Sequence, residues 1–275
     1  MINGYKSLIE ILIFIDNKYL NQFIFLLLND IYLLIKTKNI VKYKRIKNIK
    51  TNPIIIGGCA RSGTTLLLAI LSSHQNIHSI PFETNYFCNY KKSNTNFKIR
   101  KLYNYVIKHK LYDQNIRICE KTPRNILVID KLLNYFGNGL RFINIVRDGR
   151  DVVTSIHPGN PDGYWVKPDR WVNSLNIGLL YENNPQVLTI RYEDLILEFK
   201  ETMLKICEFI SEEYSTNFEC YDELSNIKKI QGRKTSLPYR NSIGRWKEGK
   251  YKELIAEFLE ERKALELLQH YNYIA

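Results

Sequence analysis

A glycine-rich turn between two apolar runs constrains the fold of this chain more than any other feature. Residues 53–56 form a short, mostly β-branched run, residues 57–63 contain three glycines, and residues 65–74 begin with an apolar, helix-like run. A strand, a glycine loop and a helix in this order gather backbone N–H groups around one point, where they bind a phosphate. The pattern therefore predicts an α/β protein in which this loop holds a phosphate group.

The loop departs from that of nucleotide hydrolases at one position. Gly58 and Gly63 have the usual spacing, but Thr64 stands where those loops carry a lysine that reaches the β- and γ-phosphates. The backbone cradle needs no lysine, so we expect a 5′-phosphate site without γ-phosphate chemistry. The guanidinium of the loop arginine adds a fixed positive charge. The residues predicted to form this site are Arg61, Ser62, Gly63, Thr64 and Thr65.

A second basic motif follows the apolar run at residues 141–146. Arg147 stands directly after this run, and Ser155 is predicted to lie about two turns into the next helix. Ligands of parallel sheets bind at the carboxyl ends of strands, so the two side chains are predicted to converge on one anion. Two phosphate sites at neighbouring strand ends fit a nucleotide phosphorylated at its 5′ and 3′ positions. The alternative is a plain helix start, since Asp148 and Asp151 favour a helix N-terminus.

Six short motifs follow one another along the chain, at residues 57–67, 81–87, 120–125, 146–155, 191–195 and 244–247. Their order and content resemble the sulfotransferases that use 3′-phosphoadenosine 5′-phosphosulfate (PAPS), closest to the branch of tyrosylprotein and related bacterial-type sulfotransferases. The resemblance covers roughly residues 52–270. It implies a P-loop-type parallel sheet flanked by helices, PAPS as the donor and a hydroxyl-bearing acceptor. A sulfuryl group carries less negative charge than a phosphoryl group, so we predict that no metal is needed.

Three residues are candidates for catalysis. A carboxylate at Glu83, beyond the phosphate loop and its helix, is able to take the proton of an acceptor hydroxyl, and the resemblance implies the same role. Arg61 and Lys121 match basic positions of the family, where they neutralise charge on the leaving phosphate and the transferred group. The alternatives are ordinary surface side chains, a solvated glutamate and a solvated lysine.

Three further residues are predicted to contact the nucleotide. Tyr192 follows the apolar run at residues 187–190, and both a binding role and a buried structural role remain open for it. The segment around Trp246 resembles the C-terminal loop that closes over the nucleotide in the family. Arg240 is predicted to reach the 3′-phosphate. Gly244 stands where the tyrosylprotein branch has a serine.

The rest of the chain predicts a single α/β domain over residues 51–275, preceded by a helical and basic extension over residues 1–50. Apolar runs typical of strands alternate with helix-like segments, the pattern of a parallel sheet with crossover helices. The predicted strands are residues 53–56, 142–146 and 187–190, and the predicted helices are residues 65–74, 125–136, 195–210 and an amphipathic closing helix at 251–268.

The extension raises the question of partners. One helix face carries Phe23, Ile24, Leu27, Leu28, Ile31, Leu34 and Ile35. A lysine-rich stretch over residues 36–50 follows, so peripheral contact with an anionic membrane is one interpretation, and packing on the domain or a homodimer face is the other. The net charge of +12 comes without a nucleic-acid-binding motif, so no nucleic-acid partner is predicted. Five cysteines without paired spacing suit a reducing, cytoplasmic setting.

The function predicted is transfer of a sulfuryl group from PAPS to the hydroxyl of a protein tyrosine, a saccharide or a small molecule. A P-loop nucleotide kinase is the first alternative, and Thr64 in place of a lysine argues against it. A catalytically inactive, membrane-associated nucleotide-binding protein is the second alternative. The acceptor itself is left open by the sequence.

Overall fold

The computed structural model describes residues 52–88, 99–111, 113, 115–157, 160–225, 227 and 240–274, and six positions between residues 24 and 35. The chain divides into two compact units. One unit comprises Met1–Asn48 with Lys98–Asp113, and the other comprises Ile49–Phe97 with Gln114–Ala275. The larger unit carries all of the sequence motifs.

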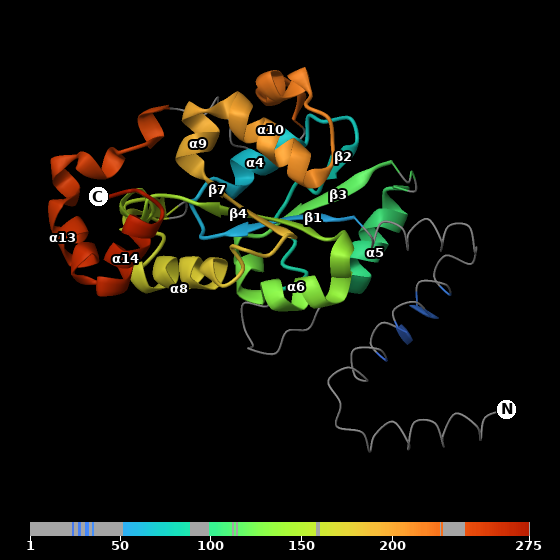
Figure 1. The fold of residues 1–275 in the computed structure, drawn as a ribbon, viewed down its shortest axis with the longest axis horizontal. Helices are drawn as coiled ribbons and strands as arrows, with labels where there is room; N and C mark the ends of the chain where they lie inside the picture. The colour runs from blue at the N-terminus through green and yellow to red at the C-terminus, as the bar shows by residue number, and fades with distance from the viewer. Residues whose placement is uncertain are drawn as a thin grey trace, which may run out of the picture. The chain divides into compact units, whose positions relative to one another are not determined.

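A five-stranded parallel sheet is the centre of the larger unit (Figure 1). Its order is β2-β3-β1-β4-β7, with β1 in the middle. The three predicted strands are confirmed as β1, β4 and β7, and every residue of β1 is buried, as a strand covered on both faces requires. The strands are β1 (Ile54–Gly58), β2 (Ile77–Ser79), β3 (Arg117–Lys121), β4 (Arg141–Val146) and β7 (Val187–Arg191).

Helices cover both faces of this sheet. Figure 1 shows α4 (Thr64–Leu71), α9 (Tyr192–Leu197) and α10 (Phe199–Ile210) on one face. On the opposite face lie α6 (Ile129–Phe136) and α8 (Pro168–Leu179). The α/β fold with a parallel sheet flanked by helices is therefore confirmed. A second apolar cluster joins α8 to the C-terminal helices through Trp171, Phe258 and Leu268, all almost fully buried.

Two predicted helices are each interrupted once. The predicted helix at 195–210 divides into α9 and α10 at Glu198, and the closing helix divides into α13 (Lys252–Glu260) and α14 (Arg262–His270) at Glu261. Glu198 has φ −123° and ψ 46°, and Glu261 is extended at ψ 103°. Neither break contains glycine or proline, so no local signal in the sequence marks it. Each break lets the following helix turn its own apolar face to the core.

The remaining elements of the larger unit are short. The predicted helix at 125–136 begins with a 3₁₀ segment, η1 (Pro123–Val128), before α6. A hairpin of β5 (Ile156–His157) and β6 (Asn160–Tyr164) follows α7 (Gly149–Val153). The other short segments are η2 (Gly137–Gly139), η3 (Thr216–Cys220), α11 (Tyr221–Leu224), η4 (Arg240–Ser242), η5 (Arg245–Lys247) and η6 (Gly249–Tyr251).

The smaller unit contains α5 (Ile99–Lys108) and helical positions of the N-terminal extension. The Tyr32 hydroxyl donates a hydrogen bond to Asn104 Oδ1 over 3.0 Å, and the Arg100 guanidinium lies 4.7 Å from the Tyr32 ring centroid. None of the helices in the described ranges is long and apolar enough to cross a membrane. The basic stretch at 36–50 lies outside the described residues, so membrane contact, a dimer face and a separate extension stay predictions.

Candidate active site

The register of the sheet brings the predicted site residues to one edge. Lys121 pairs with Ile56 across β1 and β3, and Gly58 pairs with Ile145 across β1 and β4. Val146 pairs with Arg191 across β4 and β7, so Arg147 and Tyr192 both leave the sheet at the same level. We define the phosphate loop as residues 57–65, at the end of β1. Lys121 ends β3, and Arg147 and Tyr192 directly follow β4 and β7, so these groups lie at the carboxyl ends of four neighbouring strands. This is the edge where α/β sheets bind ligands.

Two loop glycines are required by their surroundings. Gly58 has φ +139°, and a Cβ there would lie 2.3 Å from the Ile145 carbonyl oxygen. Gly63 has φ +95°, and a Cβ there would lie 2.4 Å from Cδ2 of Tyr192. The Tyr192 ring thus packs directly on the turn that starts α4. Arg61 adopts a left-handed φ of +73° and keeps its side chain exposed at the loop surface.

The N-terminus of α4 has the character of an anion site. Gly63 is its N-cap residue, no side chain caps it with a hydrogen bond, and no acidic residue lies in its first turn. The first N–H groups of a helix have no partner within the helix and point toward its positive end. The Ser62 hydroxyl beside them is buried without a hydrogen-bond partner among the described residues. These features, with Thr64 buried and Thr65 half-buried, fit a bound phosphate group.

Arg147 connects the phosphate loop to the C-terminal region. Its Nη1 donates to the Arg61 carbonyl over 3.0 Å, and its Nη2 donates to the Ser242 carbonyl. Its guanidinium lies 4.4 Å from the ring centroid of Tyr192, whose hydroxyl is 2.7 Å from Ser242 Oγ. The Nε of Arg147 is buried without a hydrogen-bond partner in the described part of the chain. A guanidinium that contacts two carbonyl oxygens and an aromatic ring, and whose Nε–H has no partner among the described residues, is suited to bind an anionic ligand.

Ser155 lies differently from the prediction. Because α7 ends at Val153, Ser155 is two residues beyond its end rather than two turns inside a helix. Its hydroxyl donates to the Asp151 carbonyl over 2.8 Å. Asp148 caps α7 by accepting from Arg150 N, which is the helix-start role that was the alternative for this motif. Convergence of Ser155 with Arg147 on one anion stays a prediction.

The segment that contains Trp246 is fastened to α7. The carboxylate of Asp151 accepts from the backbone N–H of Gly244 over 2.8 Å and from that of Trp246 over 3.1 Å. The Arg150 guanidinium lies 3.9 Å from the Trp246 ring centroid. The tryptophan therefore lies beside the helix that follows Arg147, where contact with a nucleotide stays a prediction. The side chain of Arg240 lies outside the described residues.

The two catalytic candidates outside the loop form an ion pair. Lys121 Nζ lies 2.7 Å from Glu83 Oε1. The Lys121 side chain is fully buried, whereas that of Glu83 is 40% exposed. A lysine has three donors, so this ammonium is able to serve Glu83 and a further oxygen at once. The carboxylate is oriented from inside the protein and stays open to a substrate from outside.

A buried carboxylate beside this pair was missed from the sequence. Glu120 accepts hydrogen bonds from the hydroxyls of Thr84 and Thr122, each over 2.7 Å, and from Asn125 Nδ2 over 2.6 Å. Burial raises its pKa, against the effect of these three donors. Because Thr84 is the neighbour of Glu83, this network holds the backbone that carries the candidate base. Its residues lie within the motifs at 81–87 and 120–125, but their contacts join segments 36 residues apart.

A second network fixes the start of α7 and was also missed. Arg150 binds Asp148 through two nitrogens, at 2.9 and 2.7 Å, and donates to the Tyr273 carbonyl over 2.8 Å. Glu193 accepts from the Asp148 N–H over 3.1 Å and from the Tyr273 hydroxyl over 2.8 Å, and burial raises its pKa. The C-terminal end of the chain thus stabilises the segment that presents Arg147. No local pattern in the sequence links residue 273 to this site.

Comparisons with known proteins identify the family and the fold of this chain. The model of the sulfotransferase family matches residues 53–106 and 92–216, more than half of the chain. A Caenorhabditis briggsae protein that carries the name of a protein-tyrosine sulfotransferase is 25% identical over 199 residues, covering 62% of this chain and 69% of that protein.

Two solved structures are similar in fold. The sulfotransferase domain of the Synechococcus PCC 7002 olefin synthase superposes with a TM-score of 0.58 at 16% identity, over 82% of this chain and 97% of that domain. The sulfotransferase domain from the curacin biosynthetic pathway gives a TM-score of 0.55 at 15% identity, over 82% of this chain and 98% of that domain. With the match of the family model to more than half of its length, the chain belongs to the sulfotransferase family.

Proposed function

We propose that this sulfotransferase takes the sulfuryl group from PAPS and transfers it to a hydroxyl acceptor. The observation that carries the proposal is that the uncapped N-terminus of α4 and the Arg147 guanidinium, whose buried Nε has no partner among the described residues, lie at adjacent strand ends. A loop without the hydrolase lysine suits a phosphate that is held but not hydrolysed. An arginine one strand away suits the second phosphate of the same nucleotide.

The donor is held, in this proposal, by residues of both sites. The phosphate loop contributes the backbone N–H groups at the start of α4 and the hydroxyls of Ser62, Thr64 and Thr65, and Arg147 and Ser155 bind the 3′-phosphate. The ring of Tyr192 supports both sites, since it contacts Gly63 on one side and Arg147 on the other. Trp246 and Arg240 are proposed to bind the nucleotide from the C-terminal segment.

The chemistry assigned to the protein is proton transfer and charge stabilisation. The acceptor oxygen bonds to sulfur as the bond from sulfur to the 5′-phosphate oxygen breaks, and the acceptor proton passes to the Glu83 carboxylate. Lys121 orients that carboxylate through the 2.7 Å ion pair and lies at the end of β3 next to the phosphate loop. Arg61 and Lys121 then stabilise the negative charge that builds on the leaving phosphate, as preorganised cations do in transfer reactions.

The acceptor is proposed to be a hydroxyl group of a protein tyrosine, a saccharide or a small molecule. The name of the Caenorhabditis briggsae relative supports a protein tyrosine as the first acceptor to test. The candidate base is exposed enough for any of the three to reach it, because 40% of the Glu83 side chain is accessible.

Calorimetric titration with adenosine 3′,5′-bisphosphate, compared with ATP and Mg²⁺, tests the donor. We expect the bisphosphate to be preferred and its affinity to fall by about 10- to 150-fold in Arg147→Ala, the equivalent of about 1.5–3 kcal/mol for hydrogen bonds to a charged group. Arg262→Ala is the matched control, since that side chain is 90% exposed on α14. Preference for ATP with Mg²⁺ would overturn the proposal in favour of a kinase.

Glu83→Gln tests the base separately. We expect this variant to lose sulfuryl transfer by about 100-fold or more, in the range of a positioned general base, while its bisphosphate affinity stays close to that of the wild type. The measurement is formation of adenosine 3′,5′-bisphosphate from PAPS with a panel of hydroxyl acceptors. Unchanged transfer in the variant would remove Glu83 from the role of base.

A further inference from the structure

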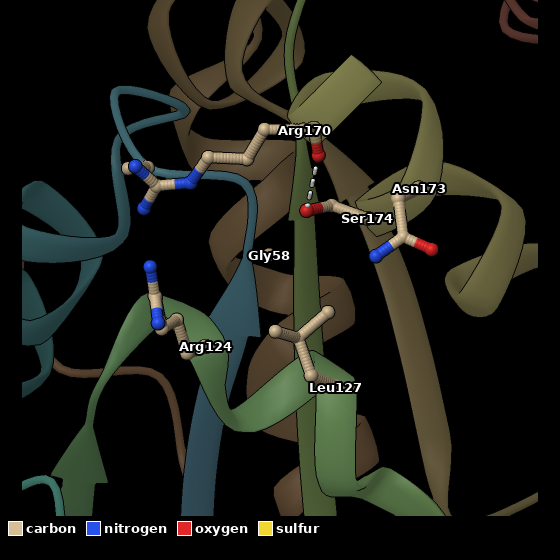
Figure 2. A pocket seen from close by; sticks show the side chains of 7 residues that line it. Gly58, Arg124, Leu127, Arg170, Asn173 and Ser174 are labelled. Atoms are coloured by element: carbon tan, nitrogen blue, oxygen red, sulfur yellow. Dashed lines mark hydrogen bonds between the residues drawn. The ribbon is translucent and has the colours of Figure 1, made fainter. Parts of the chain in front are cut away.

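A small cavity opens beside the phosphate loop, on the side of η1 and α8 (Figure 2). Its volume is about 140 Å³. This is below the roughly 300–1,000 Å³ of a complete small-molecule site, so it has room for one chemical group of a larger ligand. The residues that matter for its chemistry are Gly58 of the phosphate loop, Arg124, Leu127, Arg170, Asn173 and Ser174.

Two arginines from different elements give this cavity its charge. Arg124 comes from η1 and Arg170 comes from α8, and Figure 2 shows their guanidinium groups on the same side of the cavity. None of the described residues that line the cavity is acidic. Two guanidinium groups beside one cavity give it a positive potential, which favours a negatively charged group there. Planar guanidinium forks bind carboxylate or sulfate oxygens with two hydrogen bonds each.

The other lining groups fit the same class of ligand. The Asn173 amide offers further donors, and the Ser174 hydroxyl is held by its bond to the Arg170 carbonyl over 2.8 Å. Leu127 is 40% exposed and provides an apolar wall for the carbon atoms that carry the charged group. The cavity therefore combines a cationic side with a short apolar side.

The cavity adjoins the place where the acceptor must arrive. Gly58 and Ala60 of the phosphate loop line it, and Arg124 lies three residues after Lys121. Lys121 pairs with Ile56, two residues before Gly58 in β1, and its ammonium lies 2.7 Å from the Glu83 carboxylate. In the proposed function, the donor phosphates bind at the N-terminus of α4 and at Arg147. The cavity is thus left for the second substrate.

We propose that Arg124 and Arg170 form a subsite for an anionic group of the acceptor, a carboxylate or a sulfate held close to the hydroxyl that is sulfated. The proposal rests on the proposed function and narrows it to acidic hydroxyl compounds. An acceptor that carries such a group would be oriented by two guanidinium forks with its hydroxyl toward Glu83.

Matched acceptor pairs test the subsite. The pairs are 4-hydroxyphenylacetate with 4-hydroxyphenylacetamide, and methyl glucuronide with methyl glucoside, and the readout is the ratio of kcat/KM within each pair. We expect the charged member to be preferred by about 10-fold or more in the wild type, as for a charge-assisted hydrogen bond. Arg124→Gln and Arg170→Gln should each bring the ratio toward one. Lys167→Gln is the control, since Lys167 is an exposed cation at the start of α8 that does not line the cavity.

Equal use of both members of a pair by the wild type would overturn the subsite. A fall in bisphosphate affinity in Arg124→Gln or Arg170→Gln would also overturn it, because the cavity would then belong to the donor. If none of these compounds is sulfated, calorimetric titration of sulfate into bisphosphate-loaded protein decides the question: binding that either variant weakens at least about tenfold supports the subsite, and no binding refutes it. Absence of bisphosphate binding contradicts the proposed function instead, and sulfate titration of the free protein then tests the cavity alone.

Discussion

Gly63→Ala tests whether the Tyr192 ring sets the geometry of the phosphate loop. The native φ of +95° is a left-handed conformation, which costs a residue with a Cβ about 1–2 kcal/mol. The new methyl group would also lie 2.4 Å from Tyr192 Cδ2, and an overlap of this kind adds about 1–3 kcal/mol. We therefore expect Gly63→Ala to lower the free energy of unfolding by about 2–5 kcal/mol.

Variants at position 192 separate the cost of the backbone conformation from the cost of the overlap with the Tyr192 ring. In Tyr192→Ala the ring is gone, so the added Gly63→Ala change should cost only the backbone part, about 1–2 kcal/mol. In Tyr192→Phe the ring remains and only the hydroxyl that contacts Ser242 is lost. Gly63→Ala should therefore lower the free energy of unfolding of this variant as much as it does in the wild type. Urea unfolding followed by tryptophan fluorescence is a suitable assay, because Trp165, Trp171 and Trp246 all belong to the larger unit. An equal cost in both backgrounds, or a change below about 0.5 kcal/mol in the wild type, would refute the reasoning.

Two further predictions concern the buried charges around the site. Burial raises the pKa of Glu193 above its ordinary 4.5, so the unfolded chain loses this proton at a lower pH than the folded protein does. The contribution of Glu193 to the free energy of unfolding therefore declines as pH rises from 4.5 through the folded-state pKa. Urea titrations at several pH values should show a smaller decline in Glu193→Gln, and an identical pH profile in that variant would contradict the assignment. Arg150→Lys keeps one charge but loses the fork on Asp148 and the stacking on Trp246. It should lower the free energy of unfolding by about 1.5–3 kcal/mol and speed proteolysis of the C-terminal segment, and a variant as resistant as the wild type would show that this network is not what fastens the segment.

The local parts of this site were readable from the sequence. The strand, loop and helix over residues 53–74 were predicted because their signals are local: a β-branched run, glycines where φ is positive, and an apolar helix. Arg147 was predicted at a strand end because the apolar run of β4 stops directly before it. Parallel strands then had to bring these ends to one edge, which the observed register confirms.

The interruptions at Glu198 and Glu261 were not readable in the same way. Both residues stand within apolar patterns of helical period, and neither is a glycine or a proline. What decides the break is the direction in which Met203, Ile206 and Ile210 of α10 must face to enter the core of the sheet. The length of α7, and with it the place of Ser155, was misjudged for the same reason, because a helix end depends on what packs beyond it.

The sequence by itself determined the family, the parallel sheet and the glycine loop between β1 and α4, since these follow from short-range spacing and from residue types that few other structures need. Only the tertiary structure decided which charges meet. The pair of Lys121 with Glu83 joins residues 38 positions apart, and the bond from Gly244 to Asp151 spans 93 positions. The shared cavity of Arg124 and Arg170 likewise depends on how η1 packs beside α8. These contacts arise because whole helices and strands pack to bury their apolar faces. No local sequence pattern encodes which side chains of two different elements come into contact.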